Sequence, residues 1–150
     1  MLAYLLDTDV ISKRSGPNGK AIRRWLASID DNTLAISAIT VFEIARGVQK
    51  KRDAGDAAVA ATLQAALDAL KEGFAGRILP VDGDVAEAWG RLAGPDRPQW
   101  MDRGQVATAM RHGLVLVTCN AKDTKGRGVA GISPDHETPG RWAPDGSEIR

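Results

Sequence analysis

Short apolar runs alternate along the chain with longer segments in which apolar residues recur at helical spacing. The run from Leu2 to Leu6 is apolar throughout, which predicts a strand buried on both faces of a sheet. Further runs at 34–36, at 78–79 with Val81 and at 114–117 predict three more strands, and 129–132 predicts a last edge strand. The expected sheet therefore has four to five strands.

Helical periodicity fills the intervals between these runs. It predicts helices at about 19–29, from Ser37 onward, at 56–74, at 85–92 and at 102–112, besides a short helix after the first strand. We expect Asp9 to cap that short helix and Asp84 to cap the helix at 85–92. Strands that alternate with helices predict an α/β fold, with helices on both faces of a mostly parallel sheet.

The chain has 150 residues, enough for one domain with a hydrophobic core. Residues 133–150 hold several prolines and glycines without periodicity, so we expect a domain at 1–132 and then an irregular tail. The single cysteine, Cys119, excludes an internal disulfide framework. Because no apolar run has the length of a signal-peptide core or a membrane span, we expect a cytoplasmic protein with no membrane partner.

Four acidic residues adjoin different predicted core elements: Asp7, Glu43, Asp102 and Asp123. A carboxylate beside a core is costly unless something compensates its charge. Asp7 and Asp123 follow two predicted strands, at the edge where open α/β sheets form their sites, and the helices that carry the other two acids can approach the same edge. Carboxylates gathered in this way suit Mg²⁺ or Mn²⁺, so the pattern favours a shared cation.

Taken one at a time, each acid also has a purely structural explanation. Either Asp7 or Asp9 fits a helix cap, and Glu43 fits the spacing of a capping box. Asp102 is favourable near a helix N-terminus, and Asp123 is a common turn residue. It is the combination of four acids with strand-end placement that favours the cation.

The formal net charge is +1, from 20 Lys and Arg against 19 Asp and Glu. With the four acids screened by a metal, the remainder is mildly basic, which permits nucleic-acid binding without requiring it. Several cations near the acids either contact phosphates or simply solubilise the surface: Lys13, Arg14, Arg46, Lys122, Lys125 and Arg127. Helical spacing places Trp25 and Trp89 in the core, whereas Trp100 and Trp142 are open between core and base stacking.

Four segments of the chain resemble, in order and spacing, the motifs of PIN-domain ribonucleases. They are LLDTDVIS at 5–12, SAITVFEIARG at 37–47, Asp102 with VATA at 106–109, and GLVLVTCN at 113–120 followed by Asp123. The resemblance covers roughly residues 2–132 and is closest to the toxins of VapBC-type toxin–antitoxin pairs, including the FitB-like branch. It implies a PIN-like three-layer α/β/α fold.

The resemblance also implies an activity and a set of partners. The activity is Mg²⁺- or Mn²⁺-dependent hydrolysis of RNA, leaving a 5′-phosphate and a 3′-hydroxyl, with Asp7, Glu43, Asp102 and Asp123 as catalytic, metal-holding residues. We expect Thr118 and Asn120 to support these acids by hydrogen bonding. The implied partners are a cognate antitoxin that inhibits the toxin, operator DNA reached only through the antitoxin complex, and a second copy of the chain in a homodimer.

Three residues depart from the family pattern. Asp9 stands where the family usually has Asn, Cys119 where it often has Arg, and Thr124 where it usually has Phe. Asp9 therefore adds a possible extra acid near the metal. Metal binding is compatible with all three departures, whereas the packing and substrate contacts around 118–124 are put in doubt.

Two other function classes stay open at this point. A buried strand followed by Asp7 and Asp9 also matches the nucleophile motif of haloacid-dehalogenase-like phosphatases, with Asp82, Asp84 and Lys71 as the remaining groups. This alternative leaves Glu43, Asp102 and Asp123 unexplained. The third possibility is a non-catalytic module that binds an antitoxin and nucleic acid.

Overall fold

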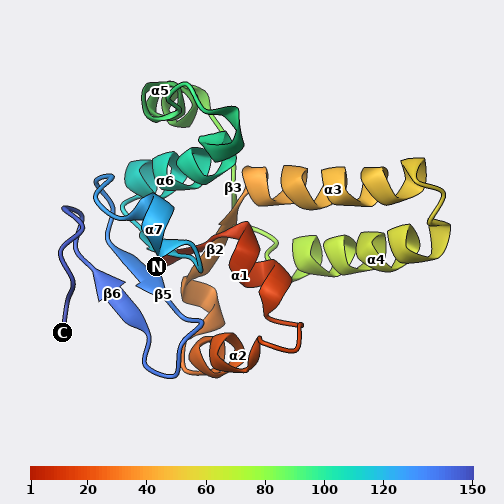
Figure 1. The fold of residues 1–150 in the computed structure, drawn as a ribbon, viewed down its shortest axis with the longest axis horizontal. Coiled ribbons are helices and arrows are strands. Elements are labelled where there is room, and N and C mark those ends of the chain that lie inside the picture. Colours follow the sequence, from red (N-terminus) through yellow and green to blue (C-terminus); the bar gives the residue numbers. More distant parts are fainter.

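A six-stranded sheet lies between two layers of helices in the computed structural model, which describes residues 1–150 (Figure 1). The strands lie in the order β3-β2-β1-β4-β5-β6, and every neighbouring pair is parallel except β5 and β6. Their bounds are β1 Tyr4–Leu6, β2 Leu34–Ser37, β3 Ile78–Leu79, β4 Val115–Val117, β5 Gly131–Ser133 and β6 Gly140–Trp142. The predicted α/β class and the mostly parallel sheet are confirmed, with one strand more than the predicted maximum.

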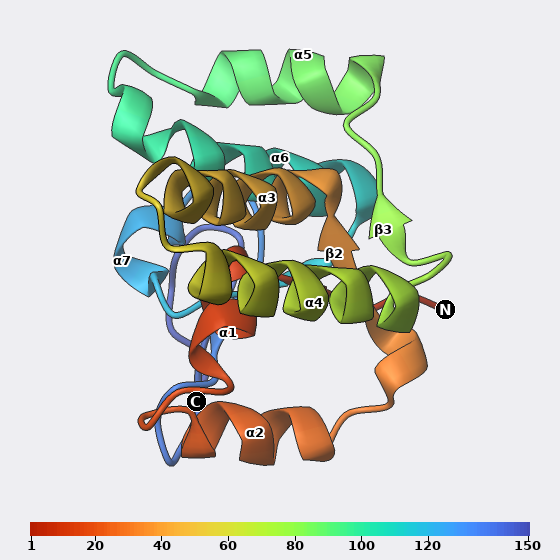
Figure 2. The ribbon, with the colours of Figure 1, turned by 90° about the vertical axis from the view of Figure 1, so that its right-hand side faces the viewer.

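Seven α-helices connect these strands. They are α1 Thr8–Lys13, α2 Lys20–Ala27, α3 Ala38–Asp53, α4 Ala57–Gly73, α5 Gly83–Leu92, α6 Trp100–His112 and α7 Ala121–Thr124, with short 3₁₀ turns at Asp31–Thr33 and Arg97–Gln99. Helices α3 and α4 form a hairpin that extends to one side of the sheet, and α5 lies over α6 on the side opposite α2 (Figures 1 and 2). None of the helices combines the length and apolar character that crossing a membrane requires.

Two hydrophobic clusters cover the two faces of the sheet, because successive strand residues point to opposite sides. On one face, Leu6, Ile36 and Val117 pack with residues of α1, α2 and α4. On the other face, Leu5 and Leu116 pack with residues of α6. Burial on both faces explains why these strands are continuous apolar runs.

Both helix caps predicted from the sequence are wrong. Helix α1 is capped by Asp7, which accepts from the N–H of Thr8, and α5 is capped by Asp82, which accepts from the N–H of Val85. In each case the helix begins earlier than the periodicity indicates, because the first acid of the pair has extended backbone and the next residue is already helical. Asp9 and Asp84 consequently lie inside the first turns.

The segment after residue 132, expected to be an irregular tail, is partly ordered onto the sheet. Strand β6 pairs antiparallel with β5, so β5 is not the edge strand that the sequence indicates. Trp142 is 1% exposed and its ring lies on Gly131, where a Cβ would collide with it. One buried indole thus anchors a segment that has too little periodicity to be recognised from sequence.

Replacing Gly131 with Ala is expected to destabilise the protein by about 1–3 kcal/mol, the usual cost of overpacking a filled core. Chemical denaturation monitored by tryptophan fluorescence measures the change. Gly47→Ala is the matched control, because nothing lies within 4 Å of the added methyl group and α3 gains helix propensity. Equal stability of the two variants would show that Trp142 does not pack on Gly131.

Candidate active site

The carboxyl ends of β1 and β4 lie side by side and open the candidate site. The N–H of Asp7 donates to the carbonyl of Val117 at 2.8 Å, which continues the parallel register of the two strands. Asp7 then enters α1, whereas Thr118 enters the loop that precedes α7. Both side chains therefore leave the sheet at the edge where α/β proteins bind ligands.

Asp7 is the most deeply buried acid of the site, at 3% exposure. Its Oδ1 accepts from the N–H of Thr8 at 2.7 Å, and its Oδ2 accepts from Oγ1 of Thr118 at 2.8 Å. Two hydrogen bonds replace only part of the hydration that an ionised carboxylate loses on burial. The site therefore starts from a carboxylate whose charge needs further compensation.

Asp9, expected to cap a helix, faces the same loop as Asp7. Its Oδ1 accepts from the N–H of Cys119 at 3.2 Å, and its Oδ2 lies 3.4 Å from Oγ1 of Thr118. The hydroxyl of Thr118 has one proton, which it donates to Asp7 because that contact is the shorter of the two. Asp9 is thus a fifth acid beside the four predicted ones, at the position where the departure from the family's Asn indicated a possible extra acid.

Glu43 reaches the site from the second turn of α3. Its Oε1 accepts from Oγ1 of Thr8 at 2.8 Å. The capping-box explanation for this residue is wrong, because Ser37 caps α3 and its Oγ accepts from the N–H of Ile39 at 3.0 Å. Glu43 lies beyond the N-terminal turn and is directed to α1 instead.

Asp102 and Asp123 are joined by one amide. Nδ2 of Asn120 donates to Oδ2 of Asp102 at 3.2 Å and to Oδ2 of Asp123 at 2.9 Å. The backbone N–H of Asn120 donates to Oγ1 of Thr118 at 3.0 Å, which ties this pair to Asp7. Helix α6 reaches α3 closely because residue 104 is glycine, where a Cβ would meet side chains of α3 and α5.

All four predicted acids therefore belong to one hydrogen-bonded network. It runs from Glu43 through Thr8 to Asp7, and from Asp7 through Thr118 and Asn120 to the other two acids. Thr118 and Asn120 make the hydrogen bonds that connect these acids, and their role in supporting a metal site stays a prediction.

Burial and mutual repulsion raise the pKa values of four carboxyl groups at this site. Burial, and then the charge of Asp9, raises the pKa of Asp7 to about 8. Burial is also the main cause that raises the pKa values of Asp9, Glu43 and Asp102, and the charge of Asp9 adds to it for Asp102. Burial raises the pKa of the Cys119 thiol to about 12, so this thiol stays protonated. A divalent cation beside these carboxyl groups would offset their mutual repulsion and favour their ionised forms.

The donor set fits a hard divalent cation. Its carboxylates, hydroxyls and amide offer the oxygen ligands that Mg²⁺ and Mn²⁺ prefer. No three His, Cys, Asp or Glu side chains form a ready-made cage as the structure stands. Mg²⁺ does not need one, because it keeps several waters and takes one or two carboxylates directly.

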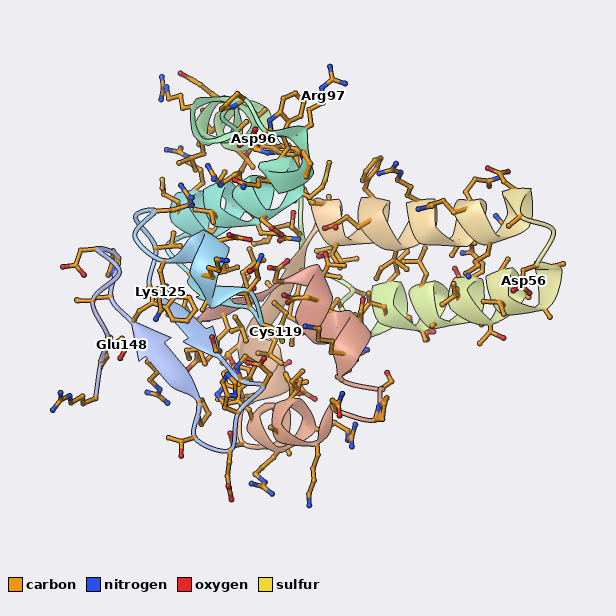
Figure 3. The ribbon with its side chains drawn as sticks, viewed as in Figure 1. Asp56, Asp96, Arg97, Cys119, Lys125 and Glu148 are labelled. Carbon is orange, nitrogen blue, oxygen red and sulfur yellow. The ribbon has the colours of Figure 1, made fainter.

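The predicted basic residues lie in different surroundings. Arg46 and Lys122 are exposed beside the site acids of their helices. Arg14 instead lines a cavity of about 460 Å³ bordered by α2 and α4. Lys125 contacts the C-terminal segment, with Nζ 3.2 Å from Oε1 of Glu148 and 5.5 Å from the Trp142 ring, and Figure 3 shows it beside the segment that carries Glu148.

The four tryptophans differ in how deeply they are buried. Trp25 is buried in the core as predicted. Trp142, which the sequence left open, is also buried. Trp89 is half-buried between α5 and α6, and its Nε1 donates to the carbonyl of Trp100 at 2.6 Å. Trp100 is 36% exposed and stacks with Arg97, whose Cζ is 5.6 Å from the ring centroid.

A family model of the PIN domain matches residues 4–123. The chain belongs to the PIN domain family. The match covers most of the chain and includes all four predicted acids. It also removes the phosphatase alternative, whose other groups lie elsewhere: Asp82 caps α5, Asp84 pairs with Arg111, and Lys71 is exposed on α4. No curated protein matches this PIN domain.

Solved structures of toxin–antitoxin complexes resemble this PIN domain. FitAcB from Neisseria gonorrhoeae is 30% identical with a TM-score of 0.72, over 89% of this chain and 99% of that chain. DNA-bound VapBC from Salmonella typhimurium is 25% identical with a TM-score of 0.59, over 82% and 90%. A toxin–antitoxin complex from Klebsiella pneumoniae, 24% identical with a TM-score of 0.62 over 91% and 100%, supports the fold alone.

The raised pKa of Asp7 predicts how the stability of the metal-free PIN domain depends on pH. The folded state holds a proton that the unfolded state releases above the ordinary value of 3.8, so this contribution is full below 3.8 and is lost as the pH rises to about 8. In EDTA, the Tm of the wild type should therefore fall relative to that of Asp7→Asn between pH 5 and pH 8.5. Asparagine still accepts from the N–H of Thr8 through its Oδ1, and its Nδ2 donates to Oγ1 of Thr118 instead of accepting from it, so the contacts are retained without a charge.

Thermal unfolding of both proteins across this range measures the effect, and each kcal/mol corresponds to about 2–4 °C in a domain of this size. A difference in Tm that stays constant with pH would contradict the burial of a protonated Asp7.

Proposed function

We propose that this PIN domain is a divalent-metal-dependent endoribonuclease and the toxin of a type II toxin–antitoxin pair. The observation that carries the proposal is the single network that joins Asp7, Glu43, Asp102 and Asp123 at the carboxyl edge of the sheet. Like charges gather there at a cost, and a structural role in capping explains only Asp7. A catalytic cation explains all four.

In this proposal the four acids hold Mg²⁺ or Mn²⁺, and Thr118 and Asn120 orient their carboxylates. When bound, the ion supplies Lewis acidity: it polarises a phosphoryl oxygen and lowers the pKa of nearby water. One of the carboxylates orients the attacking water, whose oxygen bonds to phosphorus while the bond from phosphorus to the 3′ oxygen breaks. The 3′ oxygen takes up the proton that the water loses, and the products are a 3′-hydroxyl and a 5′-phosphate.

RNA approaches so acidic a site only where cations screen its phosphates. Arg46 and Lys122 are exposed next to site acids and are the residues we propose for this contact. Arg14 and Lys125 were predicted for the same role, but the contacts of Lys125 with Glu148 and Trp142 favour an anchor for the C-terminal segment. A KM for RNA that rises steeply with salt concentration is the sign of such phosphate contacts.

The regulatory part of the proposal draws on the similar structures. They include FitAcB, FitAB bound to a DNA fragment, and DNA-bound VapBC. We propose by analogy that a cognate antitoxin inhibits this chain, that operator DNA is bound only through the antitoxin complex, and that the toxin acts on cytoplasmic RNA as a homodimer. The alternative, a non-catalytic binding module, would bind the same antitoxin and nucleic acid but would not cleave RNA.

Replacing Asp102 with Asn is expected to lower RNA cleavage in Mn²⁺ by more than about 100-fold, beyond the loss typical of residues that only orient a metal ligand. Cleavage of total RNA, with sequencing of the new ends, measures the rate and checks for 5′-phosphates. Asp68→Asn is the matched control, because that exposed acid of α4 is bound only by Gln64 on its own helix.

The same two variants separate the enzyme from the binding module. Expression without antitoxin should arrest growth for the wild type and Asp68→Asn but not for Asp102→Asn. Full activity of Asp102→Asn, or no Mn²⁺-dependent cleavage by the wild type, would contradict the proposal.

A further inference from the structure

Gln105 is a fully buried polar residue of α6. It is 0% exposed, and its neighbours Val106, Ala107 and Ala109 are equally buried. Its Oε1 has no hydrogen-bond partner. A buried amide with an unpaired oxygen is destabilising compared with an apolar side chain of the same size, so its place in the core calls for a different explanation.

The amide nitrogen of Gln105 begins a chain of hydrogen bonds that ends on Glu43. Nε2 lies 3.0 Å from Oγ1 of Thr40 and 3.3 Å from Oγ1 of Thr8. The two hydroxyl oxygens are 2.9 Å apart, and Oγ1 of Thr8 donates to Oε1 of Glu43 at 2.8 Å. The chain joins α6, α3 and α1, which are far apart in the sequence.

The number of protons fixes the direction of this chain. Each threonine hydroxyl donates once. Because the proton of Thr8 goes to Glu43, the contact between the hydroxyls requires the proton of Thr40. The oxygen of Thr40 is then left to accept, and only the amide nitrogen of Gln105 donates to it. If the Gln105 amide were reversed, Thr40 would have to donate both to Oγ1 of Thr8 and to Oε1 of Gln105, although its hydroxyl has only one proton.

We propose that Gln105 is a positioning residue that fixes the Glu43 carboxylate for metal binding through Thr40 and Thr8. This inference rests on the proposed function. The chain ends on Oε1 of Glu43, which accepts from Oγ1 of Thr8. Residues that orient metal ligands by hydrogen bonding commonly change metal affinity when they are replaced.

Gln105→Leu tests the proposal by calorimetric titration with Mn²⁺. We expect its affinity to fall about 10-fold, the lower end of the range for residues that orient a ligand. Without metal, its Tm should equal or exceed that of the wild type, since the unpaired Oε1 is gone. In a Glu43→Gln background, Gln105→Leu should leave the Mn²⁺ affinity unchanged, because its effect passes through the carboxylate.

The pair Thr40→Val and Thr40→Ser provides a second test that keeps the amide in place. Valine removes the middle hydroxyl at nearly the same volume and should weaken Mn²⁺ binding as Gln105→Leu does. Serine retains the hydroxyl and should bind Mn²⁺ like the wild type. This pair decides the question if Gln105→Leu does not fold.

Several results would overturn the proposal. Wild-type affinity in Gln105→Leu or Thr40→Val, alongside weakened binding in Glu43→Gln, rejects the positioning role and leaves the proposed function intact. An equal loss in both Glu43 backgrounds shows a general structural effect and also rejects it. If the wild type does not bind Mn²⁺ at all, the proposed function fails, and the positioning role fails with it.

Discussion

A carboxylate buried at the carboxyl ends of two parallel strands has to be neutralised, and the rest of the site is arranged around that requirement at Asp7. Strand β1 leads directly into α1 there, so the side chain has neither water nor a cationic neighbour to offset its charge. Asp9 adds a second charge two residues later, which raises the pKa of Asp7 further. Either a proton or a divalent cation can neutralise the Asp7 carboxylate. The surrounding acids favour the cation, because one proton on Asp7 would not offset the repulsion among the other carboxylates.

Two arms of hydrogen bonds hold the acids in place against their repulsion. From the sheet side, Thr118 and Asn120 connect Asp7 to the acids of α6 and α7. From the helix side, a buried amide and two threonines lead to Glu43. Each arm ends on carboxylate oxygens and draws on elements distant in sequence. These hydrogen bonds hold the acids near one another without an ion, which is the arrangement that the proposed metal-dependent hydrolysis needs.

The sequence predicts the parts of this structure that have a strong local signal. Continuous apolar runs predict the buried parallel strands, and strand-end acids predict the edge at which the site forms. Strand β6 escapes prediction, because one buried Trp142 on Gly131 holds it rather than an alternating pattern. The contacts that Asp9 and Gln105 make are not predicted, for another reason. Asp9 meets Cys119 across 110 residues and Gln105 meets Thr40 across 65, and only the tertiary fold decides that they meet.

The most direct test of the account is an anomalous difference map from crystals of the wild-type protein soaked in MnCl₂. The account predicts a manganese peak at the carboxyl edge of the sheet, in contact with Asp7 and with at least one of Glu43, Asp102 and Asp123. A peak confined to other surface carboxylates, or no peak at a pH at which Asp7 is ionised, would contradict it.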